Sequence, residues 1–184
     1  VKALEPTFGG INLEDIKAPE CFYIEEKLKE LCNIPVMHDD QHGTAIISSA
    51  ALLNALELQK KKIEKVKFVI NGAGAAATAC MKLYVSLGAK HENFMVFDID
   101  GILHKGRTDI PEIKQNFTVA EKYKDYDLAK AMNNADVFVG LSAPNVVTEA
   151  MIKSMAKNPI VFALANPDPE ISYEIAIKSR KDLI

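Results

Sequence analysis

Hydrophobic positions recur along the first third of the chain at roughly helical spacing. One such segment runs from Pro19 to Cys32 and a second from Gly43 to Gln59. The second segment is rich in Ala and Leu around most of its circumference, so we expect a long and largely buried helix. A short apolar run, Ile34 to Met37, separates the two. The Gly- and Pro-containing stretch from Glu5 to Asp15 is expected to be loop with a brief strand.

From residue 66 onward, short apolar runs alternate with helical patterns. The runs predict strands at 66–70, 94–97, 137–139 and 160–164, and the helical patterns predict helices at 75–87, 127–133, 148–157 and 173–179. Buried strands that alternate with helices are typical of a parallel sheet with right-handed crossovers. We therefore predict an α/β fold. We expect a Rossmann-like parallel sheet with helices on both faces at residues 41–184, preceded by a separate segment at residues 1–40.

A glycine-rich turn follows the first predicted strand of this sheet. The sequence from Asn71 to Ala77 has the G-x-G-x-x-A spacing and stands between a strand and a helix. Gly72 permits the tight turn, Gly74 lets a pyrophosphate approach the backbone, and Ala77 permits close packing of the helix on the strand. Ala75 opens the helix, whose free N–H groups attract phosphate. The motif predicts a dinucleotide site; the alternative is a βα turn that binds nothing.

The identity of the dinucleotide depends on Asp98, at the end of the next predicted strand. A carboxylate at this place accepts hydrogen bonds from the adenosine ribose of NAD. Asp100 adds a second acid and no basic residue follows before Lys105, so the 2′-phosphate of NADP would meet uncompensated negative charge. These residues favour NAD, with NADP as the second choice. The alternative is that Asp98 or Asp100 only starts a turn at Gly101.

Two acidic pairs, Glu14-Asp15 and Asp39-Asp40, precede the glycine-rich turn. Carboxylate oxygens suit Mg²⁺ or Mn²⁺, and such an ion polarises the oxygens of a hydroxy or keto acid. Acidic residues are also common at helix starts, so that interpretation remains open. His38 and His42 imitate the H-E-x-x-H motif of zinc hydrolases. Asp stands in place of Glu and Gly43 follows the second histidine, so zinc hydrolysis is disfavoured.

Composition and charge argue against several classes of protein. There are 22 basic and 25 acidic residues, and the one lysine cluster, at 60–62, fits the solvated end of a helix, so we expect no binding to nucleic acid. No apolar stretch approaches the ~20 residues that span a bilayer, so we expect no membrane association. We recognise no signal peptide. The cysteines Cys21, Cys32 and Cys80 lack metal-ligand spacing and predict reduced thiols in a cytoplasmic protein.

These segments together resemble the bacterial-type malic enzymes. The stretches from Ile11 to Ile16 and from Pro35 to Ala45 are similar to the two metal-site segments of that family. The stretch from Asn71 to Ala76 resembles its nucleotide turn, and Ala165 to Glu170 its later substrate-side loop. The resemblance implies oxidative decarboxylation of malate to pyruvate and CO₂ with reduction of NAD(P), within a longer, homo-oligomeric parent protein. It also implies that residues 1–40 are a partial metal- and substrate-binding segment.

The resemblance also implies roles for single residues. The metal ligands correspond to Glu14, Asp15 and Asp40, and Asp39 corresponds to the neighbour that orients a catalytic lysine. The positions that line the cofactor or contact the substrate correspond to Ser142, Ala143 and Asn166. NADP-using relatives carry Ser-Lys after the second-strand acid, whereas this chain has Ile99 and Asp100, which again favours NAD.

The general acid and base of the family, a tyrosine and a lysine, correspond to positions before Val1, and its Asn-Asn segment to positions after Ile184. Neither Tyr23 nor Lys17 stands in a matching motif. We therefore expect these 184 residues to be inactive by themselves. Two alternatives remain: the nucleotide domain of another dehydrogenase, acting on an amino acid or a folate, and an NAD-binding module without chemistry.

Overall fold

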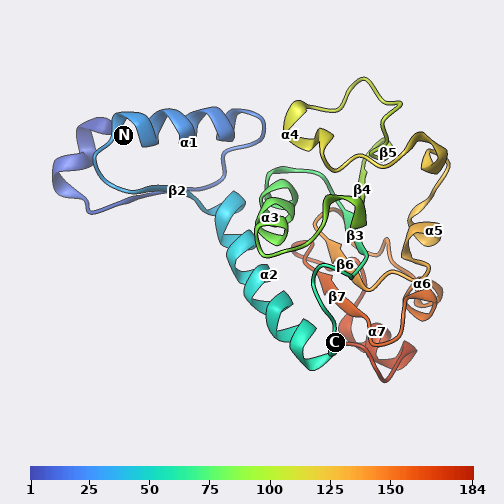
Figure 1. Ribbon diagram of the computed structural model, residues 1–184. Coiled ribbons are helices and arrows are strands. Elements are labelled where there is room, and N and C mark those ends of the chain that lie inside the picture. The colour runs from blue at the N-terminus through green and yellow to red at the C-terminus, as the bar shows by residue number, and fades with distance from the viewer.

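The computed structural model describes residues 1–184 and contains a five-stranded sheet in the order β5-β4-β3-β6-β7 (Figure 1). The parallel strands are β3 (Phe68–Asn71), β4 (Phe94–Asp98), β6 (Val137–Gly140) and β7 (Ile160–Ala163). The short β5 (Gly101–Ile102) pairs antiparallel with β4. The four predicted strands and the predicted Rossmann-like class are confirmed. The sequence missed β5, because two residues are too few to show a periodicity.

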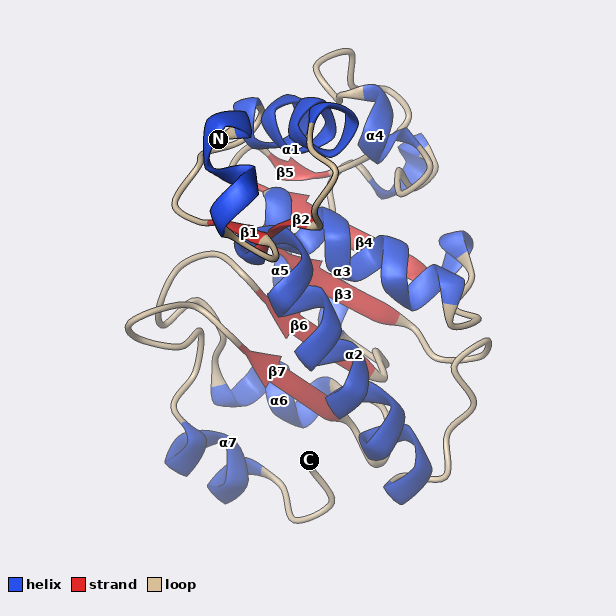
Figure 2. Cartoon of the chain, turned by 90° about the vertical axis from the view of Figure 1, so that its left-hand side faces the viewer, coloured by secondary structure: helices blue, strands red, loops and turns tan.

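Helices cover both faces of this sheet (Figure 2). One face carries α2 (Asp39–Leu58) and α3 (Ala75–Ser86), and the other carries α5 (Leu128–Met132), α6 (Glu149–Ser154) and α7 (Tyr173–Ser179). Four further elements are short: α4 (Glu112–Gln115) and the 3-10 turns η1 (Lys2–Thr7), η2 (His91–Asn93) and η3 (Glu121–Tyr123). The helices predicted in the second part of the chain are therefore present, with ends that coincide or differ by at most three residues.

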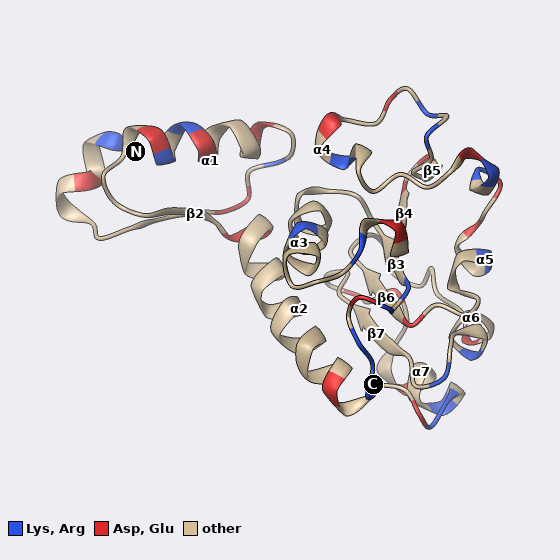
Figure 3. Cartoon of the chain, in the orientation of Figure 1, with Lys and Arg blue, Asp and Glu red and all other residues tan.

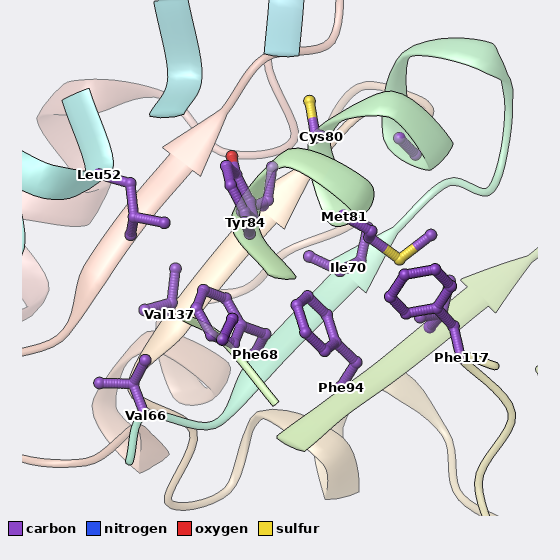
Figure 4. Packing of buried hydrophobic residues seen from close by; sticks show 14 of the residues in the cluster. Leu52, Val66, Phe68, Ile70, Cys80, Met81, Tyr84, Phe94, Phe117 and Val137 are labelled. Carbon is purple, nitrogen blue, oxygen red and sulfur yellow. The ribbon is translucent and has the colours of Figure 1, made fainter. Parts of the chain in front are cut away.

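Neighbouring residues of each strand enter opposite cores, as the two-residue period of a strand requires. Phe68 and Ile70 belong to the core beneath α2 and α3, whereas Val69 belongs to the core beneath α5, α6 and α7. The rings of Phe68 and Phe94 stack with centroids 4.7 Å apart. Figure 4 shows Tyr84 of α3 and Leu52 of α2 over this layer. These cores on both faces are why the strands are almost entirely apolar in sequence.

The long helix α2 departs from expectation in its burial. One face is buried against α3 and the sheet, at positions that include Ala45, Leu52 and Leu56. The opposite face exposes Ile46 to 56% and Ile47 to 69%. The prediction of a largely buried helix is therefore wrong for these 184 residues, because nothing in them covers the second face. Figure 3 shows that this helix carries almost no charge between its two ends.

A smaller unit precedes the main sheet and projects beyond the start of α2 (Figure 1). Its strands β1 (Ile11–Leu13) and β2 (Val36–His38) are parallel, and α1 (Glu20–Leu31) connects them. The brief strand and the helix that were predicted here are present.

All three cysteines of the chain are buried and free. None of the helices combines the length and apolar character that crossing a bilayer requires.

Candidate functional site

The strand order reverses between β3 and β6, because the chain passes from β3 to β4 on one side and from β6 to β7 on the other. Ligands of open α/β sheets bind outside the carboxyl ends of the strands at such a reversal. Asn71 at the end of β3 lies in register with Gly140 at the end of β6. The glycine-rich turn begins directly after Asn71 and therefore lies at the reversal.

The two glycines of the turn have different structural tasks. Gly72 has φ +109°, and a Cβ on it would overlap the carbonyl oxygen of Leu141, so only glycine fits there. Gly74 has φ −77°, and a Cβ on it would meet no atom within 4 Å. The space above Gly74 is therefore open to a ligand. Ala77 is 1% exposed and packs in the core beneath α3, as predicted for the third small residue.

The first turn of α3 can receive an anion. This 12-residue helix begins at Ala75, and its N-cap, Gly74, offers no side chain to the free N–H groups of the first turn. A phosphate at this place would accept from those groups and gain from the helix dipole. The arrangement of Gly72, Gly74, Ala75 and Ala77 fits a dinucleotide turn.

Asp98 carries an ion pair that the sequence did not reveal. Arg107 donates from Nη1 to Oδ1 and from Nη2 to Oδ2 of Asp98, both at 2.8 Å. The backbone N–H of Asp100 also donates to Oδ1, at 3.0 Å, so Asp98 stabilises the turn before Gly101 that was considered as the alternative. Arg107 therefore compensates part of the negative charge that a 2′-phosphate would meet, which the prediction did not include. The compensating arginine comes nine residues later, and folding brings it back to the strand end.

Three carboxylates surround this arginine. Ligand oxygens of Asp98, Asp100 and Asp109 lie within 4.8 Å of one another, the spacing of a metal site. The guanidinium of Arg107 already pairs with all three, and hydrogen bonds from it lower the pKa of Asp109 to about 2. The cluster is thus an ion-pair network that retains a net negative charge.

The predicted residues after β6 and β7 reach the same edge of the sheet. Ser142, Ala143 and Asn166 are exposed there, and Nδ2 of Asn71 donates to Oγ of Ser142 at 2.6 Å. The loops after β6 and β7 are joined by Glu170, which sequence reasoning did not single out. Two hollows of about 420 and 440 Å³ lie elsewhere, and no predicted site residue lines either. The candidate cofactor site lies outside both of these hollows.

The two acidic pairs come together through the register of β1 and β2. Leu13 pairs with His38, so Glu14-Asp15 and Asp39-Asp40 leave the same edge of the two-stranded sheet. The backbone N–H of Asp15 donates to Oδ2 of Asp40 at 2.9 Å. None of Glu14, Asp15 and Asp40 pairs with a lysine or arginine, and their oxygen donors fit Mg²⁺ or Mn²⁺. The three are less tightly clustered than the 4.8 Å group around Arg107.

Asp39 and Asp40 also form the first turn of α2, so the interpretation as helix-start residues is correct as well. The carboxylate of Asp39 folds over Gly43, where a Cβ would overlap Oδ1. Glycine is otherwise unfavourable inside a helix. Gly43 is therefore explained by the space that Asp39 occupies.

A buried hydrogen-bond network supports the segment that carries Asp39 and Asp40, and sequence reasoning did not identify it. Glu25, 6% exposed, accepts from the backbone N–H of His38 at 3.1 Å and from Nε2 of Gln41 at 3.3 Å, and pairs with Nε2 of His42 at 2.9 Å. Nε2 of Gln41 also lies 3.0 Å from Nδ1 of His38. Because the amide nitrogen donates, Nδ1 accepts and the proton of His38 resides on Nε2, which lies 3.3 Å from Oδ2 of Asp40. His38 ends β2 and lies outside α2, so the two histidines do not share one helical face as the zinc-hydrolase motif requires.

The acidic segments and the glycine-rich turn lie at the same end of the molecule. Gln59, just after α2, donates to the carbonyl oxygen of Pro159, just before β7, so α2 ends beside the amino ends of the strands. The helix has 20 residues and runs back for ~30 Å. Its first turn, with Asp39 and Asp40, therefore points to the carboxyl edge where the glycine-rich turn lies (Figure 1).

Comparison with known proteins decides the family. Residues 41–177 match the family model described as malic enzyme, NAD binding domain. The chain belongs to the malic enzyme family. It is 55% identical to the NADP-dependent malic enzyme of Haemophilus influenzae over 100% of its own length and 24% of that protein. Over 97% of its length it superposes on the crystal structure of Entamoeba histolytica malic enzyme with a TM-score of 0.90 and 43% identity, covering 38% of that chain.

The malic enzyme comparisons leave the cofactor preference open. The NAD-dependent malic enzyme of Rhizobium meliloti is 53% identical over 99% of this chain and 24% of that protein, nearly as similar as the NADP-dependent relative. The chain spans about a quarter of the length of these relatives. Membership of the family removes the alternative of an amino acid or folate dehydrogenase.

Proposed function

We propose that the chain supplies the dinucleotide-binding domain and the carboxylate metal ligands of an enzyme that converts malate to pyruvate and CO₂ while reducing NAD(P). The observation that carries the proposal is the convergence of two sites at one end of the sheet. The register of β1 and β2 unites the acidic pairs, and α2 directs them towards the edge that bears the glycine-rich turn.

Residues at the strand ends bind and orient the dinucleotide. The backbone at Gly72 and Gly74 and the first turn of α3 hold the pyrophosphate. Asp98 lies on the β4 side of the reversal and holds the adenosine ribose, while Ser142 and Asn166 hold the nicotinamide half on the other side. The bound NAD(P) supplies the acceptor for the hydride that leaves C2 of malate.

Glu14, Asp15 and Asp40 hold the divalent ion, which supplies positive charge for the oxygen at C2 during oxidation and decarboxylation. Asp15 and Asp40 are mutually anchored through the 2.9 Å hydrogen bond, and His38 lies against Asp40 from the buried side. Asp39 lies over Gly43 and, by the family resemblance, orients the lysine that moves the substrate proton.

The test compares three proteins in malate, Mn²⁺ and NAD, with NADH absorbance as the measurement: the 184-residue chain, the full-length protein that contains it, and the full-length Asp40→Asn variant. The full-length protein should form NADH, and Asp40→Asn should abolish this by removing a ligand charge. The 184-residue chain should bind NAD without turnover, because acid–base groups contribute typically ~10²- to 10⁴-fold each. Strong turnover by the chain alone would place the acid–base pair within it. Full activity of Asp40→Asn would exclude Asp40 as an essential ligand.

A further inference from the structure

Glu170 is a carboxylate with no exposed surface and no cationic partner. Its exposure is 0%, and it takes part in none of the ion pairs of the chain. Acidic side chains are almost never fully buried unless they are paired, because removing their charge from water is costly. The burial of Glu170 therefore depends on the hydrogen bonds that its carboxylate accepts.

Those hydrogen bonds join the loops that follow β6 and β7. Oε1 accepts from the backbone N–H of Ser142 at 3.0 Å, and Oε2 accepts from the backbone N–H of Ala165 at 3.1 Å. Gly140 and Ala163, at the ends of the two strands, lie in register, so Ser142 and Ala165 occupy equivalent positions beyond the ladder. The carboxylate thus enters between the strands where they separate and satisfies one N–H group from each.

Two further features hold the carboxylate in this place. A Cβ on Gly140 would overlap the carboxyl group, so glycine leaves the room that the carboxylate fills. The backbone carbonyl of Glu170 also accepts from the N–H of Val147 at 3.0 Å. The residue is therefore fixed at both its main chain and its side chain.

The linkage extends to the glycine-rich turn. Oγ of Ser142 donates to Oε1 of Glu170 at 3.5 Å and accepts from Nδ2 of Asn71 at 2.6 Å. Asn71 is the last residue of β3, directly before Gly72. A chain of side chains therefore crosses the carboxyl ends of β3, β6 and β7.

We propose that Glu170 is a positioning residue for the nicotinamide half of the cofactor. This inference rests on the proposed dinucleotide-binding function. The adenosine half belongs to the β3–β4 side of the strand reversal, where Asp98 lies, so the nicotinamide half lies over the loops that Glu170 joins. Glu170 touches neither half, and acts by holding Ser142 and Asn166 at a fixed separation.

A carboxylate suits this task because each of its oxygens accepts a hydrogen bond. In Glu170→Gln one of the two positions becomes an NH₂ group, which faces a backbone N–H with no acceptor. One loop is then released, while the size and the buried position of the side chain stay nearly the same. Glu174→Gln is the matched control, because Glu174 is an exposed residue in the first turn of α7.

The experiment measures dissociation constants of NAD and of adenosine diphosphate for the full-length protein that contains this chain. Adenosine diphosphate contains the adenosine half and the pyrophosphate but no nicotinamide. Glu170→Gln should weaken NAD binding by about tenfold, the loss expected for one hydrogen bond to a charged group, and leave adenosine diphosphate binding within about twofold. Glu174→Gln should change neither constant.

The outcomes separate the inference from the proposed function. If the unaltered protein binds neither ligand, the proposed function fails. If it binds both and Glu170→Gln weakens both equally, or weakens neither, the positioning role is overturned. Ser142→Ala tests the same linkage should Glu170→Gln not fold, because it removes only an exposed hydroxyl. It should weaken NAD binding less than tenfold and spare adenosine diphosphate; an equal effect on both ligands, or none on NAD, overturns the inference.

Discussion

Arg107 donates hydrogen bonds to Asp98 from both terminal nitrogens of its guanidinium, each 2.8 Å from a different carboxylate oxygen. The pair is largely removed from water, with the arginine side chain 11% and the aspartate side chain 23% exposed. It fixes the acid that terminates β4 and holds a cation beside that acid. We therefore expect the choice between NAD and NADP to depend on how Arg107 divides its charge between Asp98 and the bound cofactor.

We expect the full-length protein to bind NAD more tightly than NADP, because Asp98, Asp100 and Asp109 outnumber the single arginine. Asp98→Ala should reduce the ratio of the NADP to the NAD dissociation constant by about tenfold, since it removes one negative charge and frees Arg107 for the 2′-phosphate. Arg107→Ala should increase this ratio. Fluorescence titration of both cofactors measures the ratio in the unaltered protein and in the two variants. Tighter binding of NADP by the unaltered protein would contradict the expectation.

The two glycines of the turn should respond differently to a larger side chain. Gly74→Val places a branched side chain in open space where the pyrophosphate must lie, so dinucleotide binding should be lost while the melting temperature stays nearly unchanged. Gly72→Val should lower the melting temperature as well, because φ is +109° and Leu141 blocks the new Cβ. Calorimetry of NAD binding with thermal unfolding checks both. Unchanged affinity in Gly74→Val would show that the cofactor binds elsewhere.

Gly43→Ala should separate stability from catalysis. The helix α2 gains up to about 1 kcal/mol in intrinsic propensity from the replacement of glycine. The new Cβ takes the place of the Asp39 carboxylate, which must rotate away. We expect a full-length variant that unfolds at the same or a higher temperature but turns over malate at least ~10-fold more slowly, the smallest effect typical of impaired proton transfer. Undiminished turnover would mean that the position of Asp39 is not used.

Glu25 should give the protein a stability that depends on pH. Burial alone would raise its pKa, but hydrogen bonds from Lys29 and His42 outweigh it, and the pKa is lowered from 4.5. A lowered folded-state pKa means that the stabilisation is complete above pH 4.5 and is lost as the pH falls through the folded value. Glu25→Gln should cost about 2 kcal/mol of unfolding free energy at neutral pH, and the cost should shrink below this window.

Denaturant unfolding from pH 7 to pH 3 measures this difference. The matched control is Glu26→Gln, since Glu26 is the exposed neighbour of Glu25 on α1 and forms no ion pair. A cost for Glu25→Gln that stays constant with pH, or one equal to that of Glu26→Gln, would show that the buried network does not depend on the charge of Glu25.

The periodicity of the sequence was sufficient to predict the main sheet. Strands buried on both faces must be apolar along their length, so Phe68 to Ile70 and Val137 to Val139 stand out against the helical patterns between them. The same reasoning failed for α2. Apolar residues all around a helix show that the helix can be buried on every side. They do not show whether other segments of the 184 residues cover each side, and Ile47 remains 69% exposed.

The sequence by itself determined the residues whose task is set by the local backbone. Gly72, Gly74 and Ala77 follow from the geometry of a strand–turn–helix unit, which short-range sterics dictate. Only the tertiary structure decided the contacts between distant segments. Arg107 pairs with Asp98, and Glu170 joins the loops after β6 and β7. Glu25 forms hydrogen bonds with His38, Gln41 and His42. Sequence spacing carries no signal for such pairs, because a hydrogen bond depends on a separation of about 3 Å in space, and that separation is set by how the elements pack.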